Sequence, residues 1–369
     1  MLPTVMLVVD GPPDVPEDAY DGRSALQCAT TPRLDRLARQ GRLRGLRHDI
    51  SEENGETERW LALSGFVAPV PPARGPLEAS ALEVPLGGRD LVFSAPIATG
   101  LPERVDVFAT ALGAEALAEV GAALDRLWSR RWRWFAEPTT SVLRWTDGAG
   151  RRIECRTPAQ AAGTALDDML PEGDGAEEIA RLMWDSVDIL SRLPGNRRRV
   201  GEGLPPWLCI WPHGPGPSWV PPGQVPPGWS AVGSDASFLG LARSVGMRPV
   251  PIPLSGDIEE ACLRRASEVE SRLARGDAVV WVHVCRGATD PDARLAEIES
   301  VDRDLIGGVL ERLERREARV RWRVAWQGES GPVLLESDPA APIEGRLPFD
   351  GRGFADTRFE VRPSALWVE

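Results

Sequence analysis

The sequence predicts an α/β protein, in which a largely parallel sheet is covered by helices on both faces and interrupted by an inserted α+β domain. Short apolar runs alternate with amphipathic segments near both ends of the 369-residue chain, which is the rhythm of βα units. The middle of the chain lacks this rhythm. We therefore expect a discontinuous core domain, residues 1–91 and 206–369, with an inserted cap domain at residues 92–205.

The first predicted strand is the apolar run at residues 4–9. It ends in Asp10, so that a carboxylate is presented at the C-terminal end of the strand. A helix follows, with Pro32 in its first turn and Gly41 just beyond its last. A second, shorter helix is expected at residues 56–64.

The clearest helix of the expected cap spans residues 174–193, where apolar side chains recur at helical spacing behind an Asp174 cap. Another helix at 111–128 and strands within 132–155 belong to the same domain. Beyond a segment rich in Pro and Gly, the βα rhythm returns. Helices are expected at 234–245, 257–275 and 291–316, and strands at 250–254, 278–284 and 319–326.

Composition excludes several classes of protein. The net charge of −12, from 43 basic and 55 acidic residues, disfavours nucleic acid as a partner. The sequence holds no lysine, which excludes a lysine base, a Schiff base and a Walker A site. The five cysteines are dispersed and indicate free thiols. With no run of 18 apolar residues and no signal peptide, we expect a cytoplasmic protein without a membrane partner.

Ten short motifs follow one another along nearly the whole chain. They are Asp10-Gly11, TTPRLDRLARQG at 30–41, LALSGF at 61–66, RGPLEA at 74–79, LVFSAPIAT at 91–99, LPEGDGAEEIARLM at 170–183, LPGNRRR at 193–199, LCIWPHGPGP at 208–217, SFLGLARSVGM at 237–247 and VVWVHV at 279–284. In this order they resemble the archaeal-type 2,3-bisphosphoglycerate-independent phosphoglycerate mutases, a family of the alkaline phosphatase superfamily. The resemblance rests on the order of all ten, since no single motif is diagnostic.

The resemblance implies an alkaline phosphatase-like core, an inserted domain that closes over the substrate, and two divalent cations, commonly manganese, at the carboxyl edge of the sheet. In the family a serine takes the phosphoryl group from 3-phosphoglycerate and returns it to the 2-hydroxyl. Two metals that clamp the attacking and leaving oxygens need about six carboxylate and imidazole ligands.

When the family's site residues are matched one by one to this sequence, few of them are retained. Asp10 matches the first metal ligand of the family. In the family's Gly-Ser-Asp-x-x-His segment, the serine place is taken by Glu56 and the histidine place by Trp60. Thr57 is the candidate for a displaced nucleophile, although one residue along a helix turns a side chain by about 100°.

The later metal positions also depart from the family pattern. His283 matches the histidine that opens the second metal loop, but the metal aspartate falls at Ala288, which leaves Asp290 as a replacement in a shifted loop. A later Asp-His pair falls at Gln327-Gly328, and a final histidine falls at Leu335. Three substrate positions of the family fall at Ser94, Pro96 and Cys285.

We interpret the chain as a phosphoglycerate mutase-like pseudoenzyme with a binding or regulatory role, no cofactor, and a small anionic ligand or a protein as its partner. Arg197 and Arg198 are either a solvated charge run or the groups that hold the anion, because arginine forks suit phosphate and carboxylate. A cleft lined by Arg59, Trp60 and Leu335 is expected in this case, since cationic and apolar groups exclude a metal.

Two alternatives stay open. In one, the chain is an active metal-dependent phosphotransferase or mutase with a carboxylate site rearranged around Asp10, Glu56, Asp290 and Asp292, which would hold manganese or magnesium. In the other, the chain is an interaction module that presents the Trp- and Arg-rich stretch at 130–134. Asp10 itself is either a metal ligand or a strand-end residue that caps a loop.

Overall fold

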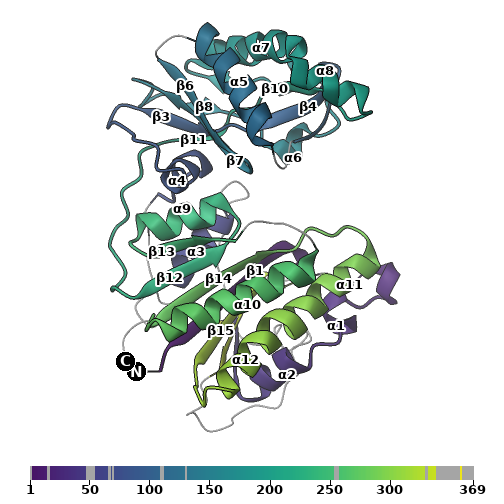
Figure 1. Cartoon of the computed structure of the whole chain (residues 1–369), viewed down its shortest axis with the longest axis vertical. Coiled ribbons are helices and arrows are strands. Elements are labelled where there is room, and N and C mark those ends of the chain that lie inside the picture. Colours follow the sequence, from purple (N-terminus) through teal and green to yellow (C-terminus); the bar gives the residue numbers. More distant parts are fainter. Residues whose placement is uncertain are drawn as a thin grey trace. The chain divides into compact units, whose positions relative to one another are not determined.

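The computed structural model divides the chain into two compact units (Figure 1). Unit 1 consists of residues 1–69 and 222–369, and unit 2 consists of residues 70–221. The structure describes residues 2–14, 17–46, 55–64, 68, 70–108, 112–128, 131–252, 257–328, 331–337 and 358–359.

In the described part of unit 1, eight strands form one sheet with β1 (Thr4–Asp14) near its middle. Strand β1 pairs in parallel with β14 (Val279–Cys285) on one side and with β15 (Arg321–Gly328) on the other. The sheet continues with β12 (Trp229–Gly233) and β13 (Arg248–Pro251) beyond β14, and with β16 (Gly331–Ser337), β2 (Gly41–Leu46) and β17 (Arg358–Phe359) beyond β15. Five adjacent parallel strands confirm the predicted fold class.

Helices cover this sheet, and Figure 1 shows α10 and α12 lying across one of its faces. The core between them is made of the apolar side chains of β1, β14 and β15 and of the inward faces of the helices. No helix in the described ranges combines the length and the apolar character needed to cross a bilayer. The helices of unit 1 are α1 (Ala25–Cys28), α2 (Pro32–Arg39), α3 (Gly55–Ser64), α9 (Ala236–Ser244), α10 (Ile258–Ala274), α11 (Pro291–Ser300) and α12 (Gly307–Glu314).

The helix expected at 291–316 is not continuous, because a π-helical segment, Val301–Ile306, separates α11 from α12. This segment buries Asp302, whose Oδ1 accepts a hydrogen bond from the backbone N–H of Leu34 at 2.7 Å. Its Oδ2 accepts from the N–H of Arg33 at 3.3 Å. Thr31, the N-cap of α2, makes no capping hydrogen bond with its side chain, so that Asp302 does this work from a distant part of the chain.

The described part of unit 2 contains two larger antiparallel sheets and a two-stranded one, with an apolar core of its own. One has the order β11-β3-β7-β6 and the other β10-β4-β5, and β8 pairs with β9. The strands are β3 (Leu91–Ser94), β4 (Ile97–Leu101), β5 (Arg104–Phe108), β6 (Trp132–Glu137), β7 (Thr140–Trp145), β8 (Ile153–Glu154), β9 (Glu172–Gly173), β10 (Trp207–Ile210) and β11 (His213–Pro217). The helices are α4 (Arg74–Ala81), α5 (Ala114–Leu127), α6 (Pro158–Ala161), α7 (Ala176–Arg192) and α8 (Pro194–Gly201).

Two details of unit 2 differ from expectation. The boundaries of the unit lie at 69/70 and 221/222, rather than at 91/92 and 205/206. The reason is that β3 and β11 pair within one sheet, which draws the segments beside them into the same unit. Helix α7 is capped by Gly175, with φ +88°, and not by Asp174, whose carboxylate pairs with Arg151 Nη1 at 3.1 Å.

Candidate functional site

The candidate site of unit 1 is centred on the carboxylate of Asp10, the last residue of β1 that pairs with β14, which is buried with 3% of its side chain exposed. Oδ1 accepts a hydrogen bond from Arg59 Nη2 at 2.7 Å. Oδ2 accepts from the indole Nε1 of Trp60 at 2.8 Å and lies 3.0 Å from Nε2 of His283. Three side chains from two other elements, α3 and β14, therefore meet on one carboxylate.

The parallel pairing of β1 with β14 brings Asp10 and His283 together. In this register Val8 lies opposite His283, and the pairing of the two strands stops at Asp10 and Cys285, so that both functional side chains lie where this pairing ends. Gly11 allows the close approach beyond this point. Its φ is +139°, and a Cβ there would lie 2.8 Å from the carbonyl oxygen of Arg286, whose N–H donates to the carbonyl of Asp10 at 2.9 Å.

Four aromatic rings pack together beside the carboxylate of Asp10. The ring of Trp60 meets those of Phe238 and His283 edge-on, with centroids 5.5 Å and 5.4 Å apart. Phe238 stacks on His283 at 4.8 Å and on Trp281 at 5.8 Å. All four rings are buried, so water has little access to the carboxylate from this side. A low local dielectric strengthens the attraction between Asp10 and its cationic partner.

The surroundings keep Asp10 ionised. Burial alone would raise the pKa of this carboxyl, but the hydrogen bond and charge of His283 and the guanidinium of Arg59 outweigh it and hold the pKa below its ordinary value of 3.8. An ionised carboxylate only accepts hydrogen bonds, so Nε2 of His283 carries its hydrogen. The other ring nitrogen, Nδ1, is buried and has no hydrogen-bond partner among the described residues.

Arg265 is a part of this neighbourhood that sequence reasoning missed. It is buried on α10, and its guanidinium donates to the carbonyl of His283 at 3.0 Å, to the carbonyl of Ala261 at 3.0 Å and to Ser234 Oγ at 3.1 Å. Burial lowers its pKa from the ordinary value. Arg265 thereby fixes the backbone of β14 at the residue whose side chain reaches Asp10. Its only signal in the sequence is an arginine on the apolar side of a helix.

The donors around Asp10 do not fit a divalent cation. A guanidinium and an indole N–H have no lone pair to offer a metal, and both carboxylate oxygens already accept hydrogen bonds from protein groups. Within the ranges that the structure describes, no three or more His, Cys, Asp or Glu side chains gather in a way that could hold a metal ion. The cluster binds its own protein donors and has the chemistry of a buried ion pair.

Of the other site residues predicted in unit 1, none hydrogen-bonds to Asp10 in the part of the chain that the structure describes. Thr57 is buried on α3, one turn before Trp60. The carboxylate of Asp290 is the N-cap of α11 and accepts from the N–H of Ala293 at 3.0 Å, and Asp292 is exposed in the first turn of that helix. Leu335 is fully buried in the core. The side chains of Glu56 and Gln327 lie outside the described residues, and Gly328 is the last residue of β15.

Arg197 and Arg198 belong to unit 2, where α8 presents them to groups of that same unit. Arg198 Nη2 pairs with Glu115 Oε1 at 2.8 Å, and Arg197 Nη2 donates to the carbonyl of Arg192 at 3.2 Å. The pair between Arg198 and Glu115 is well exposed, which is typical of a solvated charge run.

The expected Trp-rich surface at 130–134 is not formed by its tryptophans. Trp134 is buried and donates from Nε1 to the carbonyl of Ala95 at 3.1 Å. Trp132 stacks on the buried ring of Trp145 with centroids 4.4 Å apart. The alternation along β6 turns both tryptophans toward the core of unit 2, and Arg133 is the residue that faces outward.

Comparison with known proteins shows relatives along most of the chain, although no family model matches. The 2,3-bisphosphoglycerate-independent phosphoglycerate mutase of Methanothrix thermoacetophila is 29% identical over 357 residues, which cover 93% of this chain and 87% of the relative. The 2,3-bisphosphoglycerate-independent phosphoglycerate mutase 2 of Methanothermobacter thermautotrophicus is 27% identical over 363 residues, which cover 94% of this chain and 89% of the relative.

Solved structures share the fold. The cofactor-independent phosphoglycerate mutase from Thermoplasma acidophilum aligns with a TM-score of 0.56 at 21% identity and with 99% of each chain covered. A protein from Pyrococcus horikoshii aligns with a TM-score of 0.67 at 21% identity, over 95% of this chain and 91% of the other. The order of motifs, the central parallel sheet and these alignments agree, and the chain is a homologue of the archaeal 2,3-bisphosphoglycerate-independent phosphoglycerate mutases.

Proposed function

We propose that this chain is a catalytically inactive homologue of the phosphoglycerate mutases, with a binding or regulatory role. The observation that carries the proposal is the occupation of both Asp10 oxygens by Arg59, Trp60 and His283. The partner is a small anionic ligand or another protein. Metal-dependent turnover of 3-phosphoglycerate is the activity that we propose has been lost.

The physical argument concerns the energy of loading a metal. A divalent cation at Asp10 would have to displace the guanidinium at 2.7 Å, and the displaced charge would remain next to the incoming one. Arg59 has only 12% of its side chain exposed, so water would compensate little of this repulsion. Phosphoryl transfer in turn depends on metal ions that clamp the reacting oxygens.

An active site rearranged among carboxylates has less support. It would need Asp290 and Asp292 to join Asp10, but Asp290 already accepts a hydrogen bond at the N-terminus of α11. Removing it from that position would cost about 1 kcal/mol of helix capping. The side chain of Glu56, the remaining member of that set, lies outside the described residues.

The test of activity is a coupled assay of the conversion of 3-phosphoglycerate to 2-phosphoglycerate, with manganese or magnesium in excess. The mutase of Methanothrix thermoacetophila serves as the positive control. We expect the wild-type chain and the Asp10→Ala variant to show the same background rate. Turnover by the wild type that is lost in Asp10→Ala would overturn the proposal and favour the rearranged metal site.

The binding role needs its own measurement, because absence of turnover alone does not show a ligand. Isothermal titration of 3-phosphoglycerate and of inorganic phosphate into the metal-free protein tests the anionic ligand directly. Binding that weakens as salt is raised would support an anion site. No heat with either probe would leave a protein as the proposed partner, to be sought by crosslinking to an active mutase.

A further inference from the structure

We propose that Arg59 is a built-in substitute for a divalent cation at Asp10 of β1, and that it ties α3 to the sheet without any metal. This inference rests on the proposed function, since a chain that loads metal at Asp10 would have no use for such a substitute. The inference goes beyond the proposed function because it assigns a structural role to Arg59, which is to hold α3 against β1.

The tie has a defined geometry. Consecutive residues of α3, Arg59 and Trp60, donate to different oxygens of the same carboxylate, at 2.7 Å and 2.8 Å. The helix is thus attached to β1 at two atoms, and the edge-on contact of Trp60 with Phe238 attaches it to α9. His283 joins the same carboxylate from β14 at 3.0 Å. One ionised group therefore links α3, β1 and β14.

Charge decides which of these contacts is essential. The indole and the imidazole can satisfy the oxygens of Asp10 with hydrogen bonds, but Arg59 supplies a permanent positive charge at this contact. A buried carboxylate without a counter-charge is expensive to keep ionised. A metal would meet this need only when bound, whereas the guanidinium arrives with the helix itself. The position of α3 should then be independent of the concentration of divalent cations.

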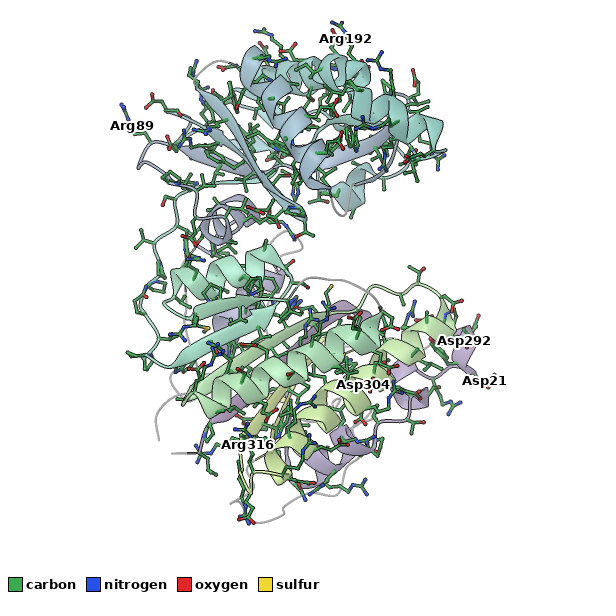
Figure 2. The ribbon with its side chains drawn as sticks, viewed as in Figure 1. Asp21, Arg89, Arg192, Asp292, Asp304 and Arg316 are labelled. Carbon is green, nitrogen blue, oxygen red and sulfur yellow. The ribbon has the colours of Figure 1, made fainter. Side chains whose placement is uncertain are left out.

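The experiment uses the full chain and five variants, of which Arg59→Lys is the one that retains the charge. Arg59→Met removes the charge and keeps a long side chain, Asp10→Asn removes the carboxylate charge, and the two are combined in a double variant. Arg316→Met is the matched control, because Arg316, labelled in Figure 2, pairs with Glu270 at 2.9 Å in the same unit but is half exposed. Hydrogen exchange is followed by mass spectrometry in peptides that cover α3, with α7 of unit 2 as an internal reference.

We expect exchange in α3 to rise at least about tenfold in Arg59→Met and to stay unchanged in Arg316→Met. In the double variant, the fold-increase of exchange in α3 should be smaller than the product of the fold-increases in the two single variants. The reason is that the double variant leaves no unpaired charge behind. The midpoint of thermal unfolding of the wild type should be the same in EDTA and in excess manganese. Arg59→Lys, which retains the charge and loses the planar fork, gives an intermediate result and serves if Arg59→Met does not fold.

Three outcomes would overturn the inference. Exchange in α3 that is no faster in Arg59→Met than in Arg316→Met would show that Arg59 does not hold the helix. Effects of Asp10→Asn and Arg59→Met that simply multiply would show that the two groups act separately. A lower unfolding midpoint of the wild type in EDTA would assign the tie to a metal. None of these measurements depends on catalytic turnover. Failure of this inference can therefore be distinguished from failure of the proposal that the chain is inactive.

Discussion

Asp10 and Asp302 are both buried carboxylates of unit 1, yet their surroundings shift their pKa values in opposite directions. Burial tends to raise both. At Asp10 the hydrogen bond and charge of His283 and the guanidinium of Arg59 win, and the pKa falls. At Asp302 burial wins, and the pKa is raised despite the N–H groups of Leu34 and Arg33.

The difference lies in the kind of positive partner. Asp10 has His283 at 3.0 Å and the guanidinium of Arg59 at 2.7 Å, and both of these side chains are shielded from water. Asp302 has two backbone dipoles, and its nearest guanidinium, that of Arg33, is 3.7 Å away and one-third exposed to water. Charge that is screened by solvent does little for a buried group. The comparison separates a carboxylate held for its charge from one held for its capacity to accept hydrogen bonds.

Removing the carboxylate that is held for its charge, that of Asp10, should have the largest effect on stability. Asp10→Ala leaves the guanidinium of Arg59 buried without its carboxylate and orphans the N–H groups of Trp60 and His283. We expect the free energy of unfolding of unit 1 to fall by about 3–5 kcal/mol, as measured by urea denaturation. A loss below about 1 kcal/mol would mean that Asp10 is an ordinary strand-end residue.

Removing the carboxylate that serves as a hydrogen-bond acceptor, that of Asp302, should lower the stability by less. Asp302→Ala leaves the N–H groups of Leu34 and Arg33 at the start of α2 without an acceptor, at a cost of about 1–3 kcal/mol. The matched control is Asp290→Ala, which removes an exposed N-cap from α11 and should cost about 1 kcal/mol. Equal losses for the two variants in urea denaturation would count against the special role of the buried cap.

The pH dependence distinguishes Asp302 from an ordinary carboxylate. Since its pKa is raised in the folded chain, the folded state holds this proton to a higher pH than the unfolded state does, in which the pKa is about 3.8. The contribution of Asp302 to stability therefore decreases as the pH rises between these two values, by at most about 1.4 kcal/mol per pH unit. Subtracting the stability of Asp302→Asn from that of the wild type over this range isolates it. A difference that grows with pH would show that the shift has the opposite sign.

The smallest effect should come from a charge pair in water. Arg192, labelled in Figure 2, pairs with Asp188 at 3.0 Å on α7, and about three-quarters of each side chain is exposed. We expect Arg192→Ala to change the stability of unit 2 by no more than about 0.5 kcal/mol, and by less still in 1 M salt. A loss comparable to that of Asp10→Ala would remove burial as the explanation of the difference.

Much of the fold could be predicted from sequence because it depends on local pattern. The apolar run of β1 and the amphipathic helix α7 lie where periodicity placed them. Asp10, Trp60 and His283 could be named as site positions because the order of motifs supplied the register. Arg59 was expected only to line a cleft with Trp60 and Leu335, and its ion pair with Asp10 came from the structure.

The features that could not be predicted depend on contacts between distant segments. The π-helical segment interrupts a sequence with continuous helical character. It carries Asp302, which caps α2 through Leu34, a residue 268 positions away in the sequence. The outward boundaries of unit 2 follow from the pairing of β3 with β11, which no local composition signals. Arg265 was missed because its position on the apolar side of a helix does not reveal the distant groups that pair with it, the carbonyl of His283 and the hydroxyl of Ser234.

The division of the chain into units has a consequence for its synthesis. Unit 2 is one continuous stretch, so all of its strands have been made once residue 221 has been translated. The central strand β1 is made first, but its partners β14 and β15 lie between residues 279 and 328. At typical rates of translation this interval lasts roughly 5–20 s after unit 2 is complete. During that time the apolar strand β1 lacks its neighbours on the ribosome, and its side chains stay exposed to wrong associations until β14 and β15 follow.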